Sequence, residues 1–322
     1  MISCLAANPS IDRLFEVDRV VRGETHRPTK FVQVAGGKGL NAARAAATLG
    51  ADVRAVAILG GHAGGWIANE LDSEKVPYRA LWIDGETRSS LSVADRRSGE
   101  MTEFYERGEA IPESLWPKLM AVVADDLAGA DLLTISGSLP PGAPLDGYKR
   151  IVELAHDIGT RVVLDAAGDY LEQALEAGPD VVKINAAEAA ALFGLQQTEI
   201  HTCATASELR ARAGGDGHAA IITLGDQGIV AAAPNGSEWK GSIDTLGRYP
   251  VGSGDAFLGG FALALDRALP WPETLALALG AAAANAELPG AGRLDAARAY
   301  ELLRAADVRR MADNPKPPHE LR

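Results

Sequence analysis

The residues best suited to chemistry lie near the C-terminal end, in the run Gly252-Ser253-Gly254-Asp255. Apolar residues follow at helical spacing: Phe257, Leu258, Phe261 and Leu265. The pattern predicts a tight turn that becomes a helix N-terminus, where free backbone N–H groups and the macrodipole favour phosphate. Asp255 would repel that phosphate unless it accepts a proton from the attacking group. We interpret the turn as an anion hole with a general base, as a phosphoryl transferase needs; the alternative is an Asp or Ser that only caps the helix.

Two common nucleotide-binding fingerprints do not fit these residues. The dinucleotide pattern G-x-G-x-x-G requires a third glycine where Phe257 stands. The P-loop pattern G-x-x-x-x-G-K-[S/T] does not occur in the chain, because Lys38 is followed by Gly39. We therefore expect neither an NAD site nor a P-loop.

A second glycine-rich run, Gly36-Gly37-Lys38-Gly39-Leu40-Asn41, leads into the alanine-rich residues 42–49, which predict a closely packed helix. A cation, Lys38, and an amide, Asn41, beside a helix N-terminus suit an anionic and hydroxylated ligand. The alternative is a plain loop-to-helix junction in which glycine serves only close packing.

Much of the remaining chain alternates short β-rich runs with helical stretches, which indicates βα units and a mostly parallel sheet. Four such runs, each expected to precede a helix, occupy residues 132–136, 161–165, 181–184 and 219–224. Ligands of these sheets bind beyond the carboxyl ends of the strands. Polar clusters stand at three of those ends: Ser136 to Gly142, Lys183 to Glu188 and Thr223 to Gly228. Together with the Asp255 turn they predict a site along one edge of the sheet.

Two other segments alternate polar and apolar residues, as strands do when one face is open to water. We expect residues 11–35 and 86–107 to form a small sheet that acts as a lid. The α/β core is then made of residues 1–10, 36–85 and 108–322. Its first strands are expected at 2–7, 53–59 and 78–83, with a helix at 66–71 and a loose tail at Pro315 to Pro318.

The composition argues against several classes of protein. The chain has 322 residues, 47% of them hydrophobic, which suffices for one large core. A net charge of −12 without any basic block argues against nucleic acid or an anionic membrane as a partner. Cys4 and Cys203 are too few for a disulfide framework or a zinc site. With no signal peptide and no membrane span in the sequence, we expect a soluble cytoplasmic protein that acts on small molecules.

These motifs resemble those of the PfkB-type sugar kinases of the ribokinase-like superfamily, within them the hexose-phosphate branch that includes 1-phosphofructokinase and tagatose-6-phosphate kinase. Six motifs follow the family's order along nearly the whole chain: Asn8 to Asp12, Gly36 to Asn41, Thr87-Arg88, Ser136 to Gly142, Asn185-x-x-Glu188 and Pro250 to Asp255. The resemblance implies a ribokinase-like fold, with a central mostly parallel sheet sandwiched by helices and a small β lid. In many relatives the lid also makes the dimer contact, so we expect a homodimer through it.

For catalysis, the resemblance implies that Asp255 accepts the proton of the attacking sugar hydroxyl. The N–H groups of Gly252, Ser253 and Gly254 would stabilise charge on the transferred phosphoryl group. ATP and Mg²⁺ are the implied cofactors, with Asn185 and Glu188 holding the metal through water; without the family, a helix-capping Asn and a surface Glu explain this pair equally well. The nucleotide-binding residues implied are Lys183, Asn185, Glu188, Thr223, Gly225, Gly228 and Asn285.

On the sugar side, Asp12 matches the family's carboxylate for sugar hydroxyls, and Gly37 and Asn41 accompany it. Two cations, Lys38 and Arg88, are the candidates for binding a phosphate already present on the sugar. Helpers in that role would be Arg27 and Ser138. Because Arg88 would lie on a lid strand, closure of the lid could bring its charge over the ligand; the alternative is an exposed strand arginine.

Two residues depart from the family pattern. Ile184 stands where many relatives have proline, and Tyr249, beside the anion-hole turn, where the hexose-phosphate kinases often have asparagine. A lysine at position 38 of the glycine-rich run resembles the pattern of the 1-phosphofructokinase and tagatose-6-phosphate kinase branch. This resemblance favours fructose 1-phosphate as the substrate, phosphorylated at its 6-hydroxyl. Tagatose 6-phosphate and fructose 6-phosphate stay open as substrates, because the same cations could hold a phosphate at either end of the sugar. A kinase for an unphosphorylated sugar or nucleoside, and a non-catalytic sugar-phosphate-binding regulator, are the more distant alternatives.

Overall fold

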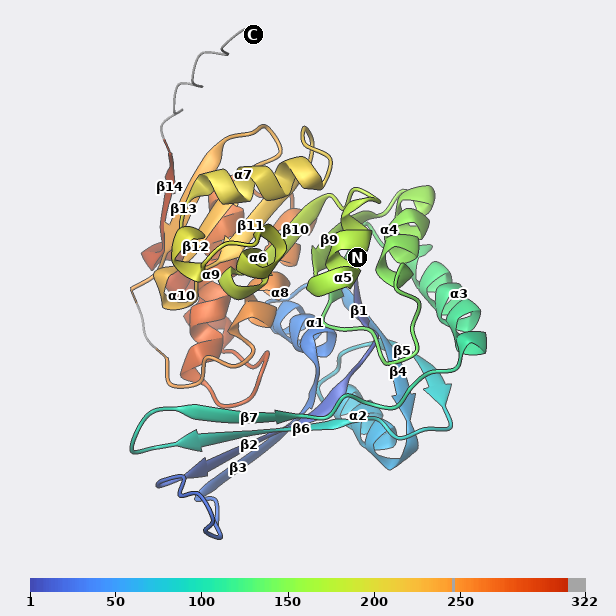
Figure 1. Ribbon diagram of the computed structural model, residues 1–322, viewed down its shortest axis with the longest axis vertical. Coiled ribbons are helices and arrows are strands. Elements are labelled where there is room, and N and C mark those ends of the chain that lie inside the picture. The colour runs from blue at the N-terminus through green and yellow to red at the C-terminus, as the bar shows by residue number, and fades with distance from the viewer. Residues whose placement is uncertain (245–246, 312–322) are drawn as a thin grey trace, which may run out of the picture.

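The computed structural model describes residues 1–244 and 247–311, so the tail predicted at Pro315 to Pro318 lies outside the described residues. The described strands form two sheets (Figure 1). The larger has ten strands in the order β14-β13-β12-β11-β10-β9-β8-β1-β4-β5, and the smaller has four in the order β3-β2-β6-β7. Within the described residues, no helix is both long and apolar enough to cross a membrane.

The bounds of the elements follow the predicted alternation of strands and helices over most of the chain. The strands are β1 (Ile2–Ala6), β2 (Ser10–Val17), β3 (Lys30–Gly36), β4 (Val53–Gly60), β5 (Tyr78–Ile83), β6 (Ser89–Asp95), β7 (Met101–Tyr105), β8 (Leu132–Ser136), β9 (Arg161–Asp165), β10 (Val181–Asn185), β11 (Ala219–Thr223), β12 (Ile229–Ala232), β13 (Glu238–Ser242) and β14 (Asp307–Arg310). The α-helices are α1 (Lys38–Thr48), α2 (Gly61–Ser73), α3 (Trp116–Leu127), α4 (Gly147–Ile158), α5 (Gly168–Leu175), α6 (Ala186–Phe193), α7 (Cys203–Arg212), α8 (Ser253–Asp266), α9 (Trp271–Glu287) and α10 (Ala296–Ala305). Short 3₁₀ helices lie at Glu113–Leu115, Gln197–Glu199 and Gly225–Gln227.

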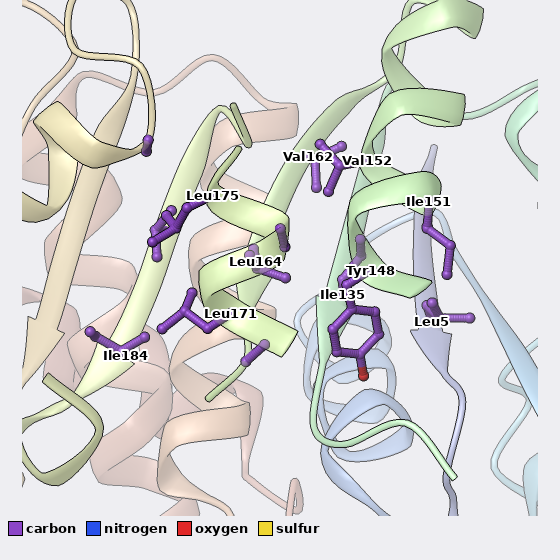
Figure 2. Close-up of a cluster of buried hydrophobic side chains, with 14 of the residues drawn as sticks. Leu5, Ile135, Tyr148, Ile151, Val152, Val162, Leu164, Leu171, Leu175 and Ile184 are labelled. Carbon is purple, nitrogen blue, oxygen red and sulfur yellow. The ribbon is translucent and has the colours of Figure 1, made fainter. Parts of the chain in front are cut away.

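Helices cover both faces of the large sheet, so its central strands are buried on both sides and have nearly continuous apolar sequences. Helices α3 to α7 pack on one face, and α1, α2, α8 and α9 on the other. In α4, for example, Tyr148, Ile151, Val152 and Ala155 recur at helical spacing and all are buried. Figure 2 shows this helix laying Tyr148 and Ile151 beside Ile135 and Leu5 of the strands.

The far end of the large sheet corrects one sequence prediction. The run over 219–224 was expected to precede a helix, but after β11 the chain makes only the 3₁₀ turn Gly225–Gln227 and returns as β12. Strands β12, β13 and β14 then pair antiparallel, so the sheet is mixed at this edge while β1, β4, β5 and β8 to β11 are parallel. The reason is a close contact with β13: Gly228 has φ of 88° and approaches Gly241 so closely that a Cβ would lie 2.0 Å from its carbonyl oxygen. This close crossing favours a hairpin over a helix.

The small sheet joins the two segments expected in the lid, and it projects from the core as a separate layer (Figure 1). Strand β2 pairs antiparallel with β3 and parallel with β6, and β6 pairs antiparallel with β7. The register places Asp12 beside Val34 and Ser90, and Ser90 beside Tyr105. These residues therefore share one face of the small sheet.

Helices α1 and α8 pack closely, which brings the two glycine-rich helix starts together. A Cβ at Gly259 would lie 2.6 Å from the Ala42 carbonyl oxygen, so only glycine allows this separation. Helix α1 begins at Lys38, four residues before the expected 42–49 stretch. Lys38 and Asn41 therefore belong to the helix itself and do not lie in the loop that precedes it.

Candidate active site

A cavity of about 1130 Å³ opens at the carboxyl ends of the parallel strands, between the core and the small sheet. Most of the residues predicted for the site line it. They are Asp12, Gly37, Lys38, Asn41, Arg88, Ser138, Lys183, Asn185, Thr223, Gly225, Gly228, Gly252, Ser253, Gly254 and Asp255. The topology explains the convergence, because carboxyl ends of parallel strands meet at one edge of a sheet.

The turn before α8 has the geometry of an anion hole. Gly252 is the N-cap with φ of 83°, and a Cβ there would lie 2.5 Å from Cα of Ala291, so conformation and space both require glycine. The Ser253 N–H already donates to the Pro250 carbonyl at 3.1 Å. In the part of the chain that the structure describes, the N–H groups of Gly252 and Gly254 have no protein acceptor. These two amides, at the positive end of α8, are available for an anion.

Asp255 lies in the first turn of the same helix, with 7% of its surface exposed. Its Oδ2 accepts a hydrogen bond from Asn41 Nδ2 at 2.9 Å. Burial raises the pKa of the carboxyl to about 6, although Lys38 and the Asn41 amide act in the opposite direction. A carboxylate with such a pKa can take a proton near neutral pH and release it again.

A buried ion cluster lies beside this helix terminus. Lys183 Nζ is 2.5 Å from Asp165 Oδ2, and both side chains are at most 5% exposed. Lys38 Nζ, from α1, is 3.3 Å from Asp165 Oδ1. Burial by itself would raise the pKa of Asp165, but Lys183 and Lys38 outweigh it and hold that pKa below its ordinary value. A Cβ on Gly254 would meet Lys183 Nζ at 3.3 Å, so the ammonium group and the free amides face the same space.

Sequence reasoning did not assign Asp165 to the site, although it placed this residue at the end of a predicted strand. A carboxylate at the carboxyl end of a parallel strand was the signal that could have identified it. Its contact with two lysines 18 and 127 residues away in the chain depends on the order of the strands, which the sequence pattern does not give.

Asp12 is held by donors on three sides. Ser10 Oγ and Ser90 Oγ each donate to its Oδ1 at 2.5 Å, and the Gly37 N–H donates to Oδ2 at 3.2 Å. A Cβ at Gly36 would overlap the Asp12 carboxylate, which explains the first glycine of the run. Neither serine was predicted for the site, because Ser90 reaches Asp12 only through the pairing of β2 with β6.

Arg88 lines the cavity, as predicted, but part of its guanidinium is bound to the backbone. Nε and Nη2 donate to the Asn8 carbonyl at 3.2 and 3.0 Å, and Nη1 donates to the Glu106 carbonyl at 3.1 Å. The arginine therefore ties the small sheet to the core at the mouth of the cavity. A second arginine of the lining, Arg107, was not predicted, because it follows the last residues of β7 without any motif.

Three predicted residues do not line the cavity: Arg27, Asn285 and Glu188, which is described below together with Asn185. Arg27 is exposed in the connection between β2 and β3. Asn285, expected near the base of the nucleotide, is fully buried in α9, where its Nδ2 donates to the Val251 carbonyl at 3.1 Å and to Ser253 Oγ at 3.3 Å. Asn285 thus supports the anion-hole turn from behind.

Asn185 and Glu188 form a capping box at the start of α6. The Asn185 side chain accepts from the Glu188 N–H at 2.9 Å, and Glu188 Oε2 accepts from the Asn185 N–H at 2.8 Å. Glu188 Oε1 lies 3.4 Å from Lys38 Nζ, and Glu188 does not itself line the cavity. Across residues 1–244 and 247–311, no three His, Cys, Asp or Glu side chains are grouped as metal ligands. The capping half of the alternative explanation is therefore confirmed, but Glu188, with 16% of its side chain exposed and Lys38 beside it, is not a surface residue. A metal role would have to use these oxygens through water.

Comparisons with known proteins identify the family of the chain. Residues 5–297 match the family described as pfkB family carbohydrate kinase. A tagatose-6-phosphate kinase of Staphylococcus epidermidis is 31% identical over 272 residues, which are 82% of this chain and 85% of that protein. Phosphofructokinase-2 from Escherichia coli, solved with substrates and products, superposes with a TM-score of 0.85 at 27% identity, covering 94% of this chain and 98% of that one.

A further solved structure supports the fold alone. It is a possible 1-phosphofructokinase from Thermotoga maritima, with a TM-score of 0.84 at 20% identity over 97% of this chain and all of that one. The ribokinase-like architecture expected from the sequence is confirmed. With the family match over most of its length and a cavity built from the family's motifs, the chain belongs to the PfkB family of carbohydrate kinases.

Proposed function

We propose that this kinase transfers the γ-phosphoryl group of ATP to a ketohexose monophosphate, with fructose 1-phosphate, phosphorylated at its 6-hydroxyl, as the first candidate. The observation that carries the proposal is a buried carboxylate, Asp255, beside two free amides of the same helix terminus. The names of its relatives, tagatose-6-phosphate kinase and phosphofructokinase-2, support a phosphorylated sugar. A cytoplasmic location belongs to the proposal, since Cys4 and Cys203 are buried free thiols.

Residues of the chain accept the proton of the sugar hydroxyl and stabilise the negative charge on the transferred phosphoryl group. Asp255 accepts the proton of the attacking hydroxyl through Oδ1, because Oδ2 is engaged by Asn41. The free amides of Gly252 and Gly254, with Lys183 beside them, bind the negative charge that grows on the phosphoryl oxygens. Asp12, fixed by Ser10 and Ser90, orients sugar hydroxyls without being consumed.

The residues at the other end of the cavity fit a nucleotide with its metal. Small or apolar side chains make a flat wall for a base: Ile243, Leu279, Ala282, Ala283 and Ala286. Gly225, with φ of 65° and no atom within 4 Å of an added Cβ, leaves room for phosphates above the strand end. Asn185 and Glu188 would hold Mg²⁺ through water, since each of their oxygens keeps a lone pair besides its present hydrogen bond. The metal would supply charge neutralisation of the triphosphate.

The cationic side chains of the cavity are assigned to two different groups, the transferred phosphoryl group and the phosphate already on the sugar. Lys38, predicted to bind the phosphate already on the sugar, has its ammonium between Asp165 and Glu188, and Asp165 above all raises its pKa. Lys38 also interacts electrostatically with Asp255 in the first turn of α8, so we assign Lys38 to the transferred group. Arg88 and Arg107, at the mouth of the cavity, remain for the sugar's own phosphate, with Ser138, whose Oγ accepts from Asn8 Nδ2 at 3.1 Å.

The proposal is tested by ADP release with Mg·ATP against fructose 1-phosphate, tagatose 6-phosphate, fructose 6-phosphate, fructose, ribose and adenosine. A phosphorylated ketohexose should dominate kcat/KM, and Arg88→Met should raise KM for it with little change in kcat. If the unphosphorylated compounds are preferred, the assignment of Arg88 and Arg107 is wrong. Binding of a sugar phosphate without ADP release would identify a regulator.

The pH dependence of kcat/KM should have an acid limb near pH 6. Asp255 must be deprotonated to accept a proton, and burial raises its pKa to about 6 from the ordinary value of 3.8. The active form is therefore lost as the pH falls through 6, by about tenfold per pH unit below it. A profile of kcat/KM between pH 4.5 and 8 checks this, and an acid limb near pH 4 would contradict it.

The outer face of the small sheet supports the expected homodimer. Phe15 and Phe31 pack edge to face with ring centres 5.5 Å apart, yet Phe31 is 55% and Phe104 60% exposed. Leu91 and Val93 lie on the same face by register, which makes an apolar surface that a second copy would cover. We expect Phe104→Glu to convert a dimer to a monomer in sedimentation velocity. The matched control Trp82→Glu, which replaces a 51% exposed aromatic residue on β5, should leave the dimer intact. A dimer unaffected by Phe104→Glu would exclude this interface.

A further inference from the structure

The general base is oriented by Asn41, and Asn41 is in turn oriented by a side chain that does not line the cavity. Asp255 Oδ2 accepts from Asn41 Nδ2, but an asparagine amide has a donor end and an acceptor end of nearly the same shape. If the amide turned over, Asn41 Oδ1 would face a carboxylate oxygen and repel it. Some neighbour must therefore fix which end of Asn41 faces Asp255.

Arg44, one turn further along α1, is that neighbour. Its Nη1 donates to Asn41 Oδ1 at 3.2 Å, and a guanidinium has only donors, so the Asn41 oxygen must point to Arg44 and its NH₂ group to Asp255. Arg44 is 4% exposed. Its position on α1, three residues after Asn41, brings the two side chains onto one face of the helix.

The guanidinium itself is held on every edge. Nε donates to both oxygens of Glu74 at 2.8 Å, Nη2 donates to the Ala35 carbonyl, and Nη1 donates also to the Ala291 carbonyl at 3.3 Å. Glu74, at the C-terminal end of α2, is 25% exposed, so the chain of contacts runs from the protein surface to the base. Such a planar group with its donors engaged in several directions has little freedom to rotate.

We propose that Arg44, anchored by Glu74, is a positioning residue that locks the Asn41 amide and thereby keeps Oδ1 of Asp255 free and deprotonated for the sugar hydroxyl. The inference rests on the proposed function, since it assigns to Asp255 the role of proton acceptor. It adds to it a pair of residues, Arg44 and Glu74, that touch neither substrate nor cofactor.

The consequence is a shift in the titration of Asp255. The charged or titratable groups facing it are Lys38 on α1, Asp165 on β9, Lys183 on β10 and Tyr105 on β7. Arg44→Lys leaves all of these in place, but an ammonium cannot reach Glu74, Asn41 and two carbonyls at once. The loss of the Asn41 donor then raises the pKa of Asp255, because a hydrogen bond to the charged form is lost.

The test is a pH profile of kcat/KM for wild type, Arg44→Lys, Asn41→Ala and the double variant. Arg44→Lys should move the acid limb upward by about one pH unit, which lowers kcat/KM roughly fivefold at pH 6 and less than about twofold at pH 8. Because both residues act through one hydrogen bond, the double variant should have the limb of Asn41→Ala, with no further shift. The inference is overturned if the acid limb of Arg44→Lys does not move, or if the double variant shows the sum of the shifts of Arg44→Lys and Asn41→Ala.

Two measurements distinguish the positioning role of Arg44 from a general loss of stability and from a failure of the proposed kinase activity. Arg54→Lys, in the remote pair of Arg54 with buried Asp126, should lower stability without moving the limb. Carboxyl ¹³C NMR of Asp255 in the enzyme without substrate should show the same upward titration in Arg44→Lys, whatever the enzyme phosphorylates. If Arg44→Lys does not fold, Glu74→Gln replaces it and should shift the titration in the same direction by a smaller amount, with no shift counting against the proposal.

Discussion

Replacing Asp255 with asparagine should lower kcat by about 10²- to 10⁴-fold, the range expected when a positioned base is removed. The amide keeps the shape of the carboxylate and its contact with Asn41, so binding should change little, and KM for the sugar phosphate and for ATP should stay within a few-fold of wild type. Steady-state ADP release above pH 7, where the wild-type base is deprotonated, measures the effect.

The stability of Asp255→Asn is the control for its activity. Asp255 is a carboxylate in a largely desolvated position, so an uncharged amide should leave the free energy of unfolding in urea unchanged or raised at pH 7. Activity within tenfold of wild type would show that another group takes the proton. A large loss of stability would show that Asp255 has a structural role instead.

Asp165→Asn should give the largest loss of stability among the variants of the site, about 3–5 kcal/mol in urea unfolding at pH 7. The substitution leaves Lys183, 5% exposed, without the carboxylate that compensates its charge. Lys38, 39% exposed, can turn toward water and should matter less. Turnover should fall as well, because the Lys183 ammonium would no longer be held beside the amides of Gly252 and Gly254.

A second substitution distinguishes the ion pair from simple crowding. Lys183→Met removes the uncompensated charge, so the double variant Asp165→Asn with Lys183→Met should recover part of the stability that Asp165→Asn loses, while activity stays low. If the free energy of unfolding of Asp165→Asn is within about 0.5 kcal/mol of the wild-type value, Lys183 does not depend on this carboxylate and its charge is compensated elsewhere.

The parts of the fold that the sequence predicted are those with local signals. Alternating runs identified the strands of the small sheet, short β-rich runs identified the parallel strands of the large sheet, and the glycines before Ser253 and Lys38 marked the two helix starts. The antiparallel edge was missed because β12 and β13 are short and the close approach of Gly228 to Gly241 is a tertiary contact. A glycine in a loop does not reveal which backbone lies against it.

The candidate site also divides into residues that have local sequence signals and residues that are placed by tertiary contacts. Motif residues such as Asp12, Asn41 and Asp255 were predicted and do line the cavity. Their partners were not predicted. Ser90 reaches Asp12, and Asp165 reaches Lys38, only through the order of the strands. Arg44 lies one turn after Asn41 on the same helix, but the contacts with Glu74 and the Ala291 carbonyl that fix its guanidinium are tertiary. Asn185 and Glu188 show the converse limit, since their spacing is equally that of a capping box, which the structure contains.

³¹P NMR of fructose 1-phosphate with Mg·ATP follows the phosphoryl transfer itself, in the wild-type enzyme and in Asp255→Asn. We expect a new phosphomonoester signal at C6 of the sugar that grows together with ADP, and a rate at least a hundredfold lower with the variant. ADP formation with inorganic phosphate and no sugar product, or equal rates for the two proteins, would contradict this expectation.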